Sequence, residues 1–280
     1  MPSPFSLLLP VWAGDDADQL ARSFASAVTE QVLRPDQVVV VRDGPVGEGL
    51  QAVLDALPTA SPVPVLVVAL PQNVGLARAL TAGLAACTHD IVARQDADDV
   101  AVPERFAAQI PAVDAGLDLL GSGLSEFVDD EDVLVGRRVP PLTEEAIRAY
   151  APFHSPFNHP TIVFRRRAVQ AAGGYQDVGT MEDYWLFVRM LQAGARVGNL
   201  AEPLVKYRIG AGAYRRRGGL KLLRTELRLQ ALMHGAGFTS GSQYLRNVAV
   251  RGTYRLLPEA VRRVSYRSLI QRGFRRGRTS

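Results

Sequence analysis

Short apolar runs alternate along the first hundred residues with segments whose apolar positions repeat every three or four residues. In one such segment, Leu76, Leu80, Leu84 and Cys87 fall on one face of a helix. Alternation at this spacing predicts right-handed βαβ units, and hence an α/β fold with a mainly parallel sheet flanked by helices. We expect strands at 5–11, 37–42, 63–70 and 90–95, and helices at 15–33, 47–57 and 75–87.

The rest of the chain mixes helices with fewer strands. Segment 129–141 is acidic, then basic, then proline-rich, and we expect an exposed connection there. Segment 207–219 is rich in glycine and arginine, and we expect it to be mobile. Further strands are expected at 117–122 and 161–165, and helices at 104–115, 143–150, 182–193, 220–234 and 243–257.

Polar residues follow each of the early strands. Asp43-Gly44 comes after the second strand, Gln72-Asn73 after the third, and Asp96-Ala97-Asp98-Asp99 after the fourth. Parallel strands end at the same edge of a sheet, and ligands of open α/β sheets bind beyond that edge. These residues therefore define one candidate binding rim.

Composition and length exclude several classes of protein. Hydrophobic residues make up 47% of the 280, too many for a disordered chain. A single cysteine, Cys87, excludes an intramolecular disulfide and any multi-cysteine metal site. The longest apolar run, 63–70, is far shorter than the roughly 20 residues that span a bilayer, and the N-terminus lacks the basic segment of a secretory signal. We therefore expect a cytoplasmic protein.

Positive charge is concentrated near the C-terminus. Residues 246–280 contain ten arginines and one acidic residue, so the other 245 residues carry a net charge of −5 although the whole chain carries +4. The body is therefore not expected to bind nucleic acid. Arginines alternate with apolar residues in 246–280, which favours peripheral contact with the inner face of the cell membrane. Nucleic-acid contact by this segment and a solvated helical tail are the alternatives.

Three carboxylates within four residues, Asp96, Asp98 and Asp99, are the sharpest chemical feature. Such crowding is best tolerated around a cation, and hard oxygen ligands suit Mg²⁺ or Mn²⁺ bound together with a substrate diphosphate. A solvated acidic turn before a helix is the alternative. Phosphatases of the haloacid dehalogenase type carry a D-x-D motif on the first strand, and prenyl-diphosphate enzymes are all-helical. A motif after the fourth strand of an α/β chain therefore favours neither class.

Asp43 and Arg78 are expected at the same rim. The Asp43 carboxylate can accept hydrogen bonds from a nucleoside, although an Asp-Gly turn explains this residue equally well. Arg78 falls in the first turn of the helix expected at 75–87. There its guanidinium and the helix N-terminus can both face a phosphate, and a surface arginine is the alternative.

Taken in order, these motifs resemble those of the family 2 glycosyltransferases of GT-A fold. The segments are Pro10-Val11, Asp43-Gly44, Asn73-x-Gly75-x-Ala77-Arg78, Asp96-Ala97-Asp98-Asp99 and Glu182-Asp183-Tyr184-Trp185. The stretch from Asn158-His159-Pro160 to Arg189-Met190 is similar to exopolysaccharide and O-antigen enzymes of the amylovoran type. The resemblance covers about residues 5–210. It implies a GT-A catalytic domain at 1–215, with a nucleotide-binding half at 1–100 and an acceptor half at 101–215, before a helical, arginine-rich extension at 216–280.

The resemblance also implies roles for individual residues. Asp183 would be the general base of a displacement that inverts the anomeric carbon, and Asp98 with Asp96 would hold the Mg²⁺ or Mn²⁺ that bridges the donor diphosphate. Arg42 and Leu80 depart from the family pattern, which leaves base recognition open. The residues implied in nucleotide binding are Pro10, Val11, Asp43, Arg78 and Asp96.

Weaker candidates for contact with the acceptor or donor sugar are Glu182, Trp185, His159 and Arg208. Trp185 stands at a helix start, where aromatic residues also serve the core, and Asp183 can alternatively satisfy the helix dipole. Arg208 begins a basic, glycine-containing segment that either closes over phosphates or is solvated.

The expected function is metal-dependent transfer of a sugar from a nucleotide sugar, expected to be UDP-linked, to a hydroxyl of a glycan or lipid-linked glycan in surface polysaccharide biosynthesis. A nucleotidyltransferase would carry a G-x-G-T-R loop after the first strand, where this chain has Pro10-Val11-Trp12-Ala13-Gly14. A non-catalytic nucleotide- or glycan-binding protein is a further alternative, disfavoured by the presence of both Asp98 and Asp183.

Overall fold

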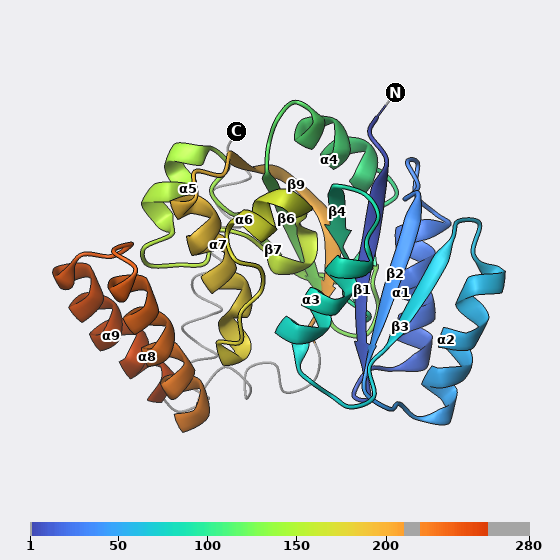
Figure 1. The fold of residues 1–280 in the computed structure, drawn as a ribbon, viewed down its shortest axis with the longest axis horizontal. Helices are drawn as coiled ribbons and strands as arrows, with labels where there is room; N and C mark the ends of the chain where they lie inside the picture. Colours follow the sequence, from blue (N-terminus) through green and yellow to red (C-terminus); the bar gives the residue numbers. More distant parts are fainter. Residues whose placement is uncertain (1, 210–218, 257–280) are drawn as a thin grey trace.

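A computed structural model describes residues 2–209 and 219–256 of the chain. Within these residues the chain forms a nine-stranded sheet of mixed direction with helices on both faces (Figure 1). The strand order is β3-β2-β1-β4-β8-β6-β9-β5, and β7 pairs with β6 outside this path. Figure 1 shows the parallel strands near one end of the molecule and helices α8 and α9 at the other.

The nucleotide-binding half expected from the sequence is a parallel four-stranded unit. Strand β1 pairs in parallel with β2 and β4, and β2 pairs in parallel with β3. The four strands and the three helices between them lie where the apolar pattern predicts them, within a few residues. They are β1 (Phe5–Trp12), α1 (Ala17–Val28), β2 (Gln37–Asp43), α2 (Glu48–Ala60), β3 (Val65–Ala69), α3 (Leu76–Ala86) and β4 (Ile91–Arg94).

Alternate residues of the parallel strands enter two different cores. Leu8 and Val39 pack on one face of the sheet with α3 and with helix α7 (Glu182–Gln192). Leu7 and Val38 pack on the other face with α1, α2 and helix α4 (Arg105–Asp114). Burial on both faces explains why these strands read as continuous apolar runs.

The second half continues the sheet with antiparallel and parallel partners. Strand β8 runs antiparallel to β4 and to β6, and β6 runs parallel to β9. The remaining elements of this half are β5 (Val100–Ala101), β6 (Leu119–Phe127), β7 (Leu134–Arg138), α5 (Glu144–Tyr150), the 3₁₀ turn η1 (His159–Thr161), β8 (Val163–Arg165), α6 (Arg166–Ala171), the 3₁₀ turn η2 (Gly179–Met181) and β9 (Val197–Arg208).

One expectation for this half was wrong, and strand β9 was not predicted. Segment 129–141 is not only a connection, because it contains β7, which pairs antiparallel with β6. Leu134 and Val135 are exposed on this strand, so no apolar–polar alternation marks it. The apolar pattern also misses β9, which contains Glu202-Pro203 and pairs with β6 through register shifts near Gly123.

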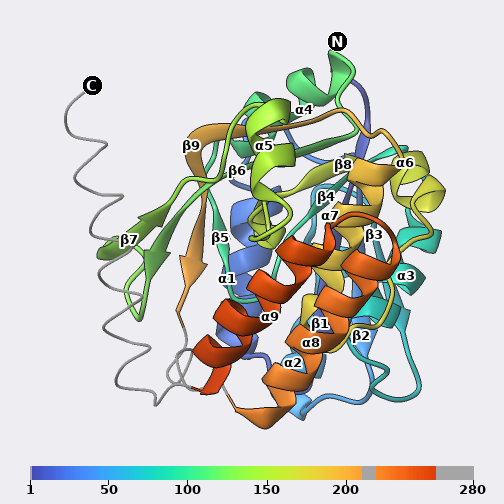
Figure 2. The ribbon, with the colours of Figure 1, turned by 90° about the vertical axis from the view of Figure 1, so that its left-hand side faces the viewer.

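The extension expected at 216–280 is described only at 219–256, where it forms α8 (Leu220–Gly235) and α9 (Gly241–Leu256). The two helices form a hairpin that lies across α7 (Figure 2). Leu229 and Met233 of α8 pack against Trp185 and Val188 of α7. Most of the segment expected to be mobile, 207–219, lies outside the described residues, as does 257–280. In the part of the chain that is described, no helix combines the length and apolarity needed to cross a membrane.

Candidate active site

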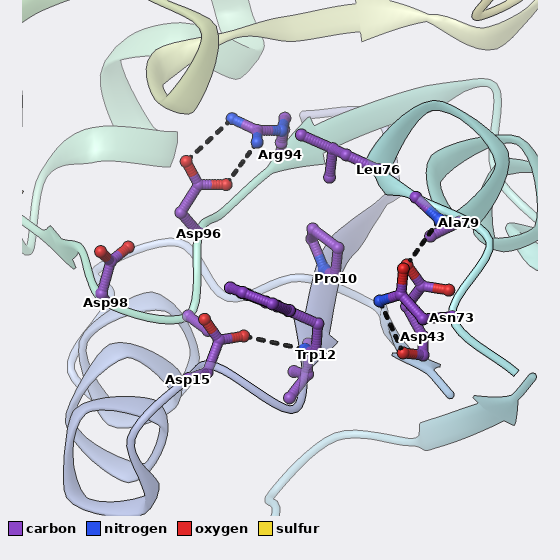
Figure 3. A pocket seen from close by; sticks show the side chains of 13 residues that line it. Pro10, Trp12, Asp15, Asp43, Asn73, Leu76, Ala79, Arg94, Asp96 and Asp98 are labelled. Atoms are coloured by element: carbon purple, nitrogen blue, oxygen red, sulfur yellow. Dashed lines mark hydrogen bonds and ion pairs between the residues drawn. The ribbon is translucent and has the colours of Figure 1, made fainter. Parts of the chain in front are cut away.

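A cavity of about 380 Å³ opens beyond the carboxyl ends of β1, β2 and β4, where the strand pattern predicts a binding rim. Figure 3 shows the acidic residues Asp15, Asp96 and Asp98 on one side of it and Asp43 with Asn73 on the other. The nucleotide-binding candidates that line this cavity are Pro10, Val11, Asp43 and Asp96, and Asp98 lines it as well. Trp12, which is 55% exposed, adds an aromatic face that sequence reasoning did not assign.

Asp43 connects the end of β2 to the start of α3. Its two carboxylate oxygens accept hydrogen bonds from the backbone N–H groups of Val74 (2.7 Å) and Gly75 (3.0 Å). Gly44 has a φ of 87°, and a Cβ there would lie 2.5 Å from the backbone nitrogen of Asn73, so only glycine fits. Asp43 thus forms the Asp-Gly turn and also lines the cavity. Its role in nucleotide binding stays a proposal.

Buried Arg94 and partly exposed Asp96 form an ion pair that borders two cavities. The two terminal nitrogens of the Arg94 guanidinium contact the two carboxylate oxygens of Asp96. Arg94 is 3% exposed, although it ends an otherwise apolar strand. Sequence reasoning gave Arg94 no role. The sequence did carry a signal for Arg94, because a charged residue at the end of an apolar strand stands two positions before an acidic residue.

Asp15 is a second residue that sequence reasoning missed. Its carboxylate accepts a hydrogen bond from the Trp12 backbone N–H (2.9 Å), which directs it into the cavity, while Asp16 caps α1. Burial raises the pKa of Asp15 to about 6, and the nearby charges of Asp98 and Asp96 add to this rise. Burial, with the charge of Asp96, likewise raises the pKa of Asp98 to about 6.

These carboxylates fit a divalent cation. Repulsion between Asp15, Asp96 and Asp98 contributes to both raised pKa values, and a cation relieves such repulsion. Within residues 2–209 and 219–256, no three His, Cys, Asp or Glu side chains lie close enough to hold a metal unaided. Mg²⁺ is usually held by one or two carboxylates together with substrate phosphates and water, so Asp98 and Asp96 suit a site that the donor completes.

Asp99 and Arg208 hold the acidic loop in place. Asp99 is fully buried, and one of its carboxylate oxygens accepts the Arg208 backbone N–H (3.0 Å). The Arg208 side chain donates to the Asp98 carbonyl (3.1 Å) and lies over the Phe127 ring. Arg208 therefore braces the loop from behind, and it is not among the described residues that line either cavity. A lid role for this residue does not fit these contacts.

A second cavity of about 840 Å³ lies on the other side of the Arg94–Asp96 pair, and both residues line it. Asp183 also lines it, at the start of α7, and its carboxylate accepts the Tyr184 backbone N–H (2.7 Å). Burial raises the pKa of Asp183, while the Tyr184 N–H and Arg94 act in the opposite direction. A carboxylate with a raised pKa is a stronger proton acceptor than an ordinary one.

His159 lies in the wall beside Asp183. Its Nε2 is 3.1 Å from the Tyr175 hydroxyl, and its Nδ1 is 3.9 Å from an Asp183 carboxylate oxygen. Burial, together with the charge of Arg94, lowers the pKa of His159 well below its usual value, so the ring is neutral. His159 therefore lies where the sequence places it, next to Asp183 in the second cavity.

Besides Arg208, three candidates are not brought to either cavity in the described structure. Arg78 is exposed on α3. Trp185 is 6% exposed and donates from its ring nitrogen to Gln176 (2.8 Å), so it packs in the core and cannot stack on a sugar. Glu182 is buried behind Asp183, and burial with the charge of Asp183 raises its pKa to about 7.

Residues 6–172 match the Glycosyl transferase family 2, and the chain belongs to this family of enzymes. Its fold is that of the GT-A glycosyltransferases. The chain is 36% identical over 265 residues to the amylovoran biosynthesis glycosyltransferase AmsE of Erwinia amylovora, which covers 94% of this chain and 97% of that protein. It is 31% identical over 271 residues to the UDP-Gal:alpha-D-GlcNAc-diphosphoundecaprenol beta-1,3-galactosyltransferase of Escherichia coli, over 96% and 97% of the two chains.

Solved structures show the same fold at lower sequence identity. Residues 1–349 of S. aureus TarS in complex with UDP-GlcNAc align with a TM-score of 0.64 at 16% identity, covering 89% of this chain and 72% of that one. The mannosyltransferase PcManGT of Pyrobaculum calidifontis, in complex with GDP-Man and Mn²⁺, aligns with a TM-score of 0.57 at 18% identity, covering 92% and 73%. Family membership sets aside the nucleotidyltransferase and non-catalytic alternatives.

Proposed function

We propose that this glycosyltransferase moves a sugar from a UDP-sugar to a hydroxyl of a glycan or lipid-linked glycan, with inversion at the anomeric carbon. The observation that carries the proposal is the Arg94–Asp96 pair, which forms part of the wall of both cavities. A donor in the first cavity and an acceptor in the second would meet at this wall. The named activities of the relatives support a role in surface polysaccharide biosynthesis.

The first cavity is proposed to hold the nucleotide. Pro10, Val11 and Trp12 offer an apolar surface for a base, and Asp43 lies at the far side of the same cavity. Arg78 stays a proposed phosphate contact from the exposed face of α3. S. aureus TarS, which has a similar fold and was solved in complex with UDP-GlcNAc and with UDP, supports a uridine donor.

Asp98 and Asp96 are proposed to hold Mg²⁺ or Mn²⁺ together with the donor diphosphate. Such an ion stabilises the negative charge that develops on the departing nucleoside diphosphate. Arg94 fixes Asp96 from one side, and Arg208 fixes the backbone of Asp98 from behind. These contacts hold the carboxylates in position before the donor binds.

Asp183 is proposed as the general base. An acceptor hydroxyl in the second cavity gives its proton to the Asp183 carboxylate as its oxygen attacks the anomeric carbon, and the bond from that carbon to the donor phosphate breaks. One base suffices for direct displacement, and no covalent enzyme intermediate forms. The Tyr184 N–H orients the carboxylate, and neutral His159 lies beside it.

We place the enzyme in the cytoplasm, with the acceptor presented at the inner face of the cell membrane. Residues 246–280 are proposed to provide peripheral membrane contact through their ten arginines. The first eleven of these residues belong to α9, and Asn247 and Arg251 of this helix donate to the carbonyls of Pro152 and Phe153. The proposed contact therefore depends on residues 257–280, which lie outside the described part of the chain.

The proposal is tested by thermal shift with UDP, GDP, dTDP and the corresponding nucleotide sugars, each with and without Mn²⁺. We expect the largest stabilisation from a uridine ligand with Mn²⁺, because ligand binding to the native state raises the melting temperature. Stabilisation by none of these ligands would contradict the proposed donor class.

A further inference from the structure

The ring of His159, at the edge of the second cavity, is held by residues that lie outside the cavity. His159 is 9% exposed, and its ring lies edge-on to Phe187 of α7, with the ring centroids 5.9 Å apart. Its Nε2 faces the Tyr175 hydroxyl at 3.1 Å, and its Nδ1 faces Asp183. Tyr175 is 7% exposed and is not among the described residues that line either cavity. Tyr175 therefore contacts the ring from behind.

The segment that carries Tyr175 is fixed to α7. The Arg189 side chain of this helix donates to the Gly174 carbonyl (2.7 Å), and the Trp185 ring nitrogen donates to the Gln176 side chain (2.8 Å). These contacts fix the residues directly before and after Tyr175 in the chain. Because α7 also carries the proposed general base, Tyr175 keeps a defined position relative to that carboxylate.

The hydrogen bond between Tyr175 and His159 indicates which ring nitrogen carries the proton of the neutral imidazole. Burial raises the pKa of the Tyr175 hydroxyl, so the hydroxyl keeps its proton and can donate to Nε2. Within the described residues, this hydroxyl has no other hydrogen-bond partner. A proton on Nε2 would leave the tyrosine O–H without an acceptor and would turn the lone pair of Nδ1 toward the Asp183 carboxylate. The arrangement that satisfies these groups therefore has the proton on Nδ1.

The gap between His159 and Asp183 suits one oxygen atom. The Nδ1 atom and a carboxylate oxygen of Asp183 lie 3.9 Å apart, which is too far for a direct hydrogen bond. An oxygen about 2.8 Å from both atoms makes an angle of about 90° between them, so it can accept the Nδ1–H and donate to the carboxylate. Both residues line the second cavity, where the acceptor is proposed to lie. A hydroxyl is both a donor and an acceptor, and it therefore matches this pair.

We propose that Tyr175 fixes the proton of His159 on Nδ1, so that His159 and Asp183 hold the attacking acceptor hydroxyl between them. The hydroxyl oxygen accepts the Nδ1–H with one lone pair, gives its proton to Asp183, and attacks the anomeric carbon with the other lone pair. His159 keeps its own proton throughout, and Tyr175 is a positioning residue that does not touch the substrate. This inference rests on the proposed function, because it assigns how the same site orients its acceptor.

The first test determines the tautomer of His159 in the full-length protein without ligands, by long-range ¹H–¹⁵N NMR of protein labelled at histidine. The chain has four histidines, and replacing each of the other three by glutamine in turn assigns the His159 signals by elimination. Tyr175→Phe removes the hydroxyl and keeps the ring. Tyr184→Phe is the matched control, since Tyr184 is 3% exposed and its hydroxyl donates to the Ala151 carbonyl (2.6 Å).

We expect the proton of His159 on Nδ1 in the wild type and in Tyr184→Phe. In Tyr175→Phe the ratio of the two tautomers should shift toward Nε2 about tenfold, the effect of losing one hydrogen bond. A proton on Nε2 in the wild type, or an equal shift in both variants, would overturn the proposal.

The second test measures hydrolysis of the UDP-sugar that stabilises the protein most, with water in place of the acceptor hydroxyl. Tyr175→Phe should lower kcat for UDP release about tenfold. UDP affinity, measured by calorimetry, should be unchanged, because Tyr175 is not among the described residues lining the first cavity. Unchanged UDP release in a variant whose tautomer has shifted would show that His159 does not hold the attacking oxygen, and would overturn the proposal. Failure of UDP to bind contradicts the proposed donor instead, and the tautomer measured without ligands still tests the contact between Tyr175 and His159.

Discussion

Arg94 and Asp96 pair through both terminal nitrogens of the guanidinium, and this pair separates the cavity proposed for the donor from the cavity proposed for the acceptor. The pair is supported by Arg105, which is fully buried and donates to the Arg94 carbonyl (2.6 Å) and to Gln95 (2.6 Å). Arg105 also reaches the Pro160 carbonyl (3.2 Å) beside His159. The position of the Arg94–Asp96 pair is therefore fixed from inside the protein.

Replacing Arg94 by lysine should lower kcat/KM about tenfold to a hundredfold. A lysine ammonium cannot contact both Asp96 oxygens with the same geometry, so the carboxylate loses its fixed orientation. Steady-state kinetics with the sugar nucleotide found by thermal shift measures the effect. Arg167→Lys is the control, because Arg167 is 69% exposed and pairs with Asp90 at the surface. Equal kinetics for both variants would refute a role for the pair in transfer.

Asp183→Asn should lower kcat by about a hundredfold to ten-thousandfold, the usual contribution of a general base. UDP affinity should remain unchanged, because Asp183 lines the second cavity and is not among the described residues lining the first. Calorimetry and initial rates separate the two effects. Asp177→Asn is the control, since Asp177 is an exposed acid near the same helix. Loss of UDP binding equal to the loss of activity would rule out the assigned role.

Chelation with EDTA should abolish transfer, and Mn²⁺ or Mg²⁺ should restore it. Asp98→Asn should raise the Mn²⁺ concentration required for half-maximal activity about tenfold or more, because an amide is a weaker ligand than a carboxylate. A Mn²⁺ titration of activity measures the shift. Asp18→Asn, on the exposed face of α1, should leave it unchanged. Full activity in EDTA would disprove metal dependence.

The pH dependence of activity should have an acidic limb set by Asp183. Asp183 must be deprotonated to act as a base, and burial raises its pKa, so activity should rise with pH over a range above that of an ordinary carboxyl group. Burial and the charge of Asp183 raise the pKa of Glu182 to about 7, so Asp183 ionises first and Glu182 is neutral across this limb. Glu182→Gln, which resembles the neutral acid, should therefore leave the limb in place. Profiles of kcat/KM from pH 4.5 to 9 test this, and a limb moved by about one pH unit in the variant would contradict the assignment to Asp183.

The same carboxylates predict how stability depends on pH. Their pKa values are raised in the folded protein, so the folded state holds these protons more tightly than the unfolded chain. Their contribution to the free energy of unfolding should therefore decrease as pH rises from ordinary carboxyl values to about 7. The free energy of urea unfolding should differ less between pH 5.5 and pH 8 for Glu182→Gln than for the wild type. An equal difference in both proteins would show that Glu182 does not contribute to the pH dependence of stability.

Removing residues 257–280 should reduce sedimentation with vesicles that contain anionic lipid and should not affect behaviour with neutral vesicles. Seven of the ten arginines of 246–280 lie in this segment, and each contributes about 1 kcal/mol near an anionic surface. The deletion must spare α9, because Asn247 and Arg251 donate to the carbonyls of Pro152 and Phe153. Unchanged sedimentation of the shortened protein would end the membrane proposal.

The parallel half of the fold follows from local sequence because its strands are buried on both faces and its helices carry one apolar face. Strands β7 and β9 do not follow, since β7 exposes Leu134 and Val135 and β9 contains Pro203. Their positions depend on pairing with β6, which is not visible in a short window of sequence. Edge strands and irregular strands are set by tertiary contacts.

The candidate site, like the fold, could be predicted from the sequence only in part. Asp43, Asp96 and Asp98 were found because strand ends predict a rim, and all three line the first cavity. Arg94 and Asp15 were missed because their importance depends on neighbours that the fold supplies. Trp185 was expected near a sugar because it adjoins Asp183, but successive helix positions point in different directions, and its ring enters the core.

The hairpin of α8 and α9 has a consequence for how related enzymes diverge. The family match ends at residue 172, and the hairpin that follows supplies Arg255 to the second cavity and anchors the loop before His154. The residues that line the first cavity all lie within the family match, whereas the second cavity also takes Asp183, Tyr207 and Arg255 from beyond it. A chimera that exchanges this hairpin between two relatives should keep its donor and change the glycan that it extends.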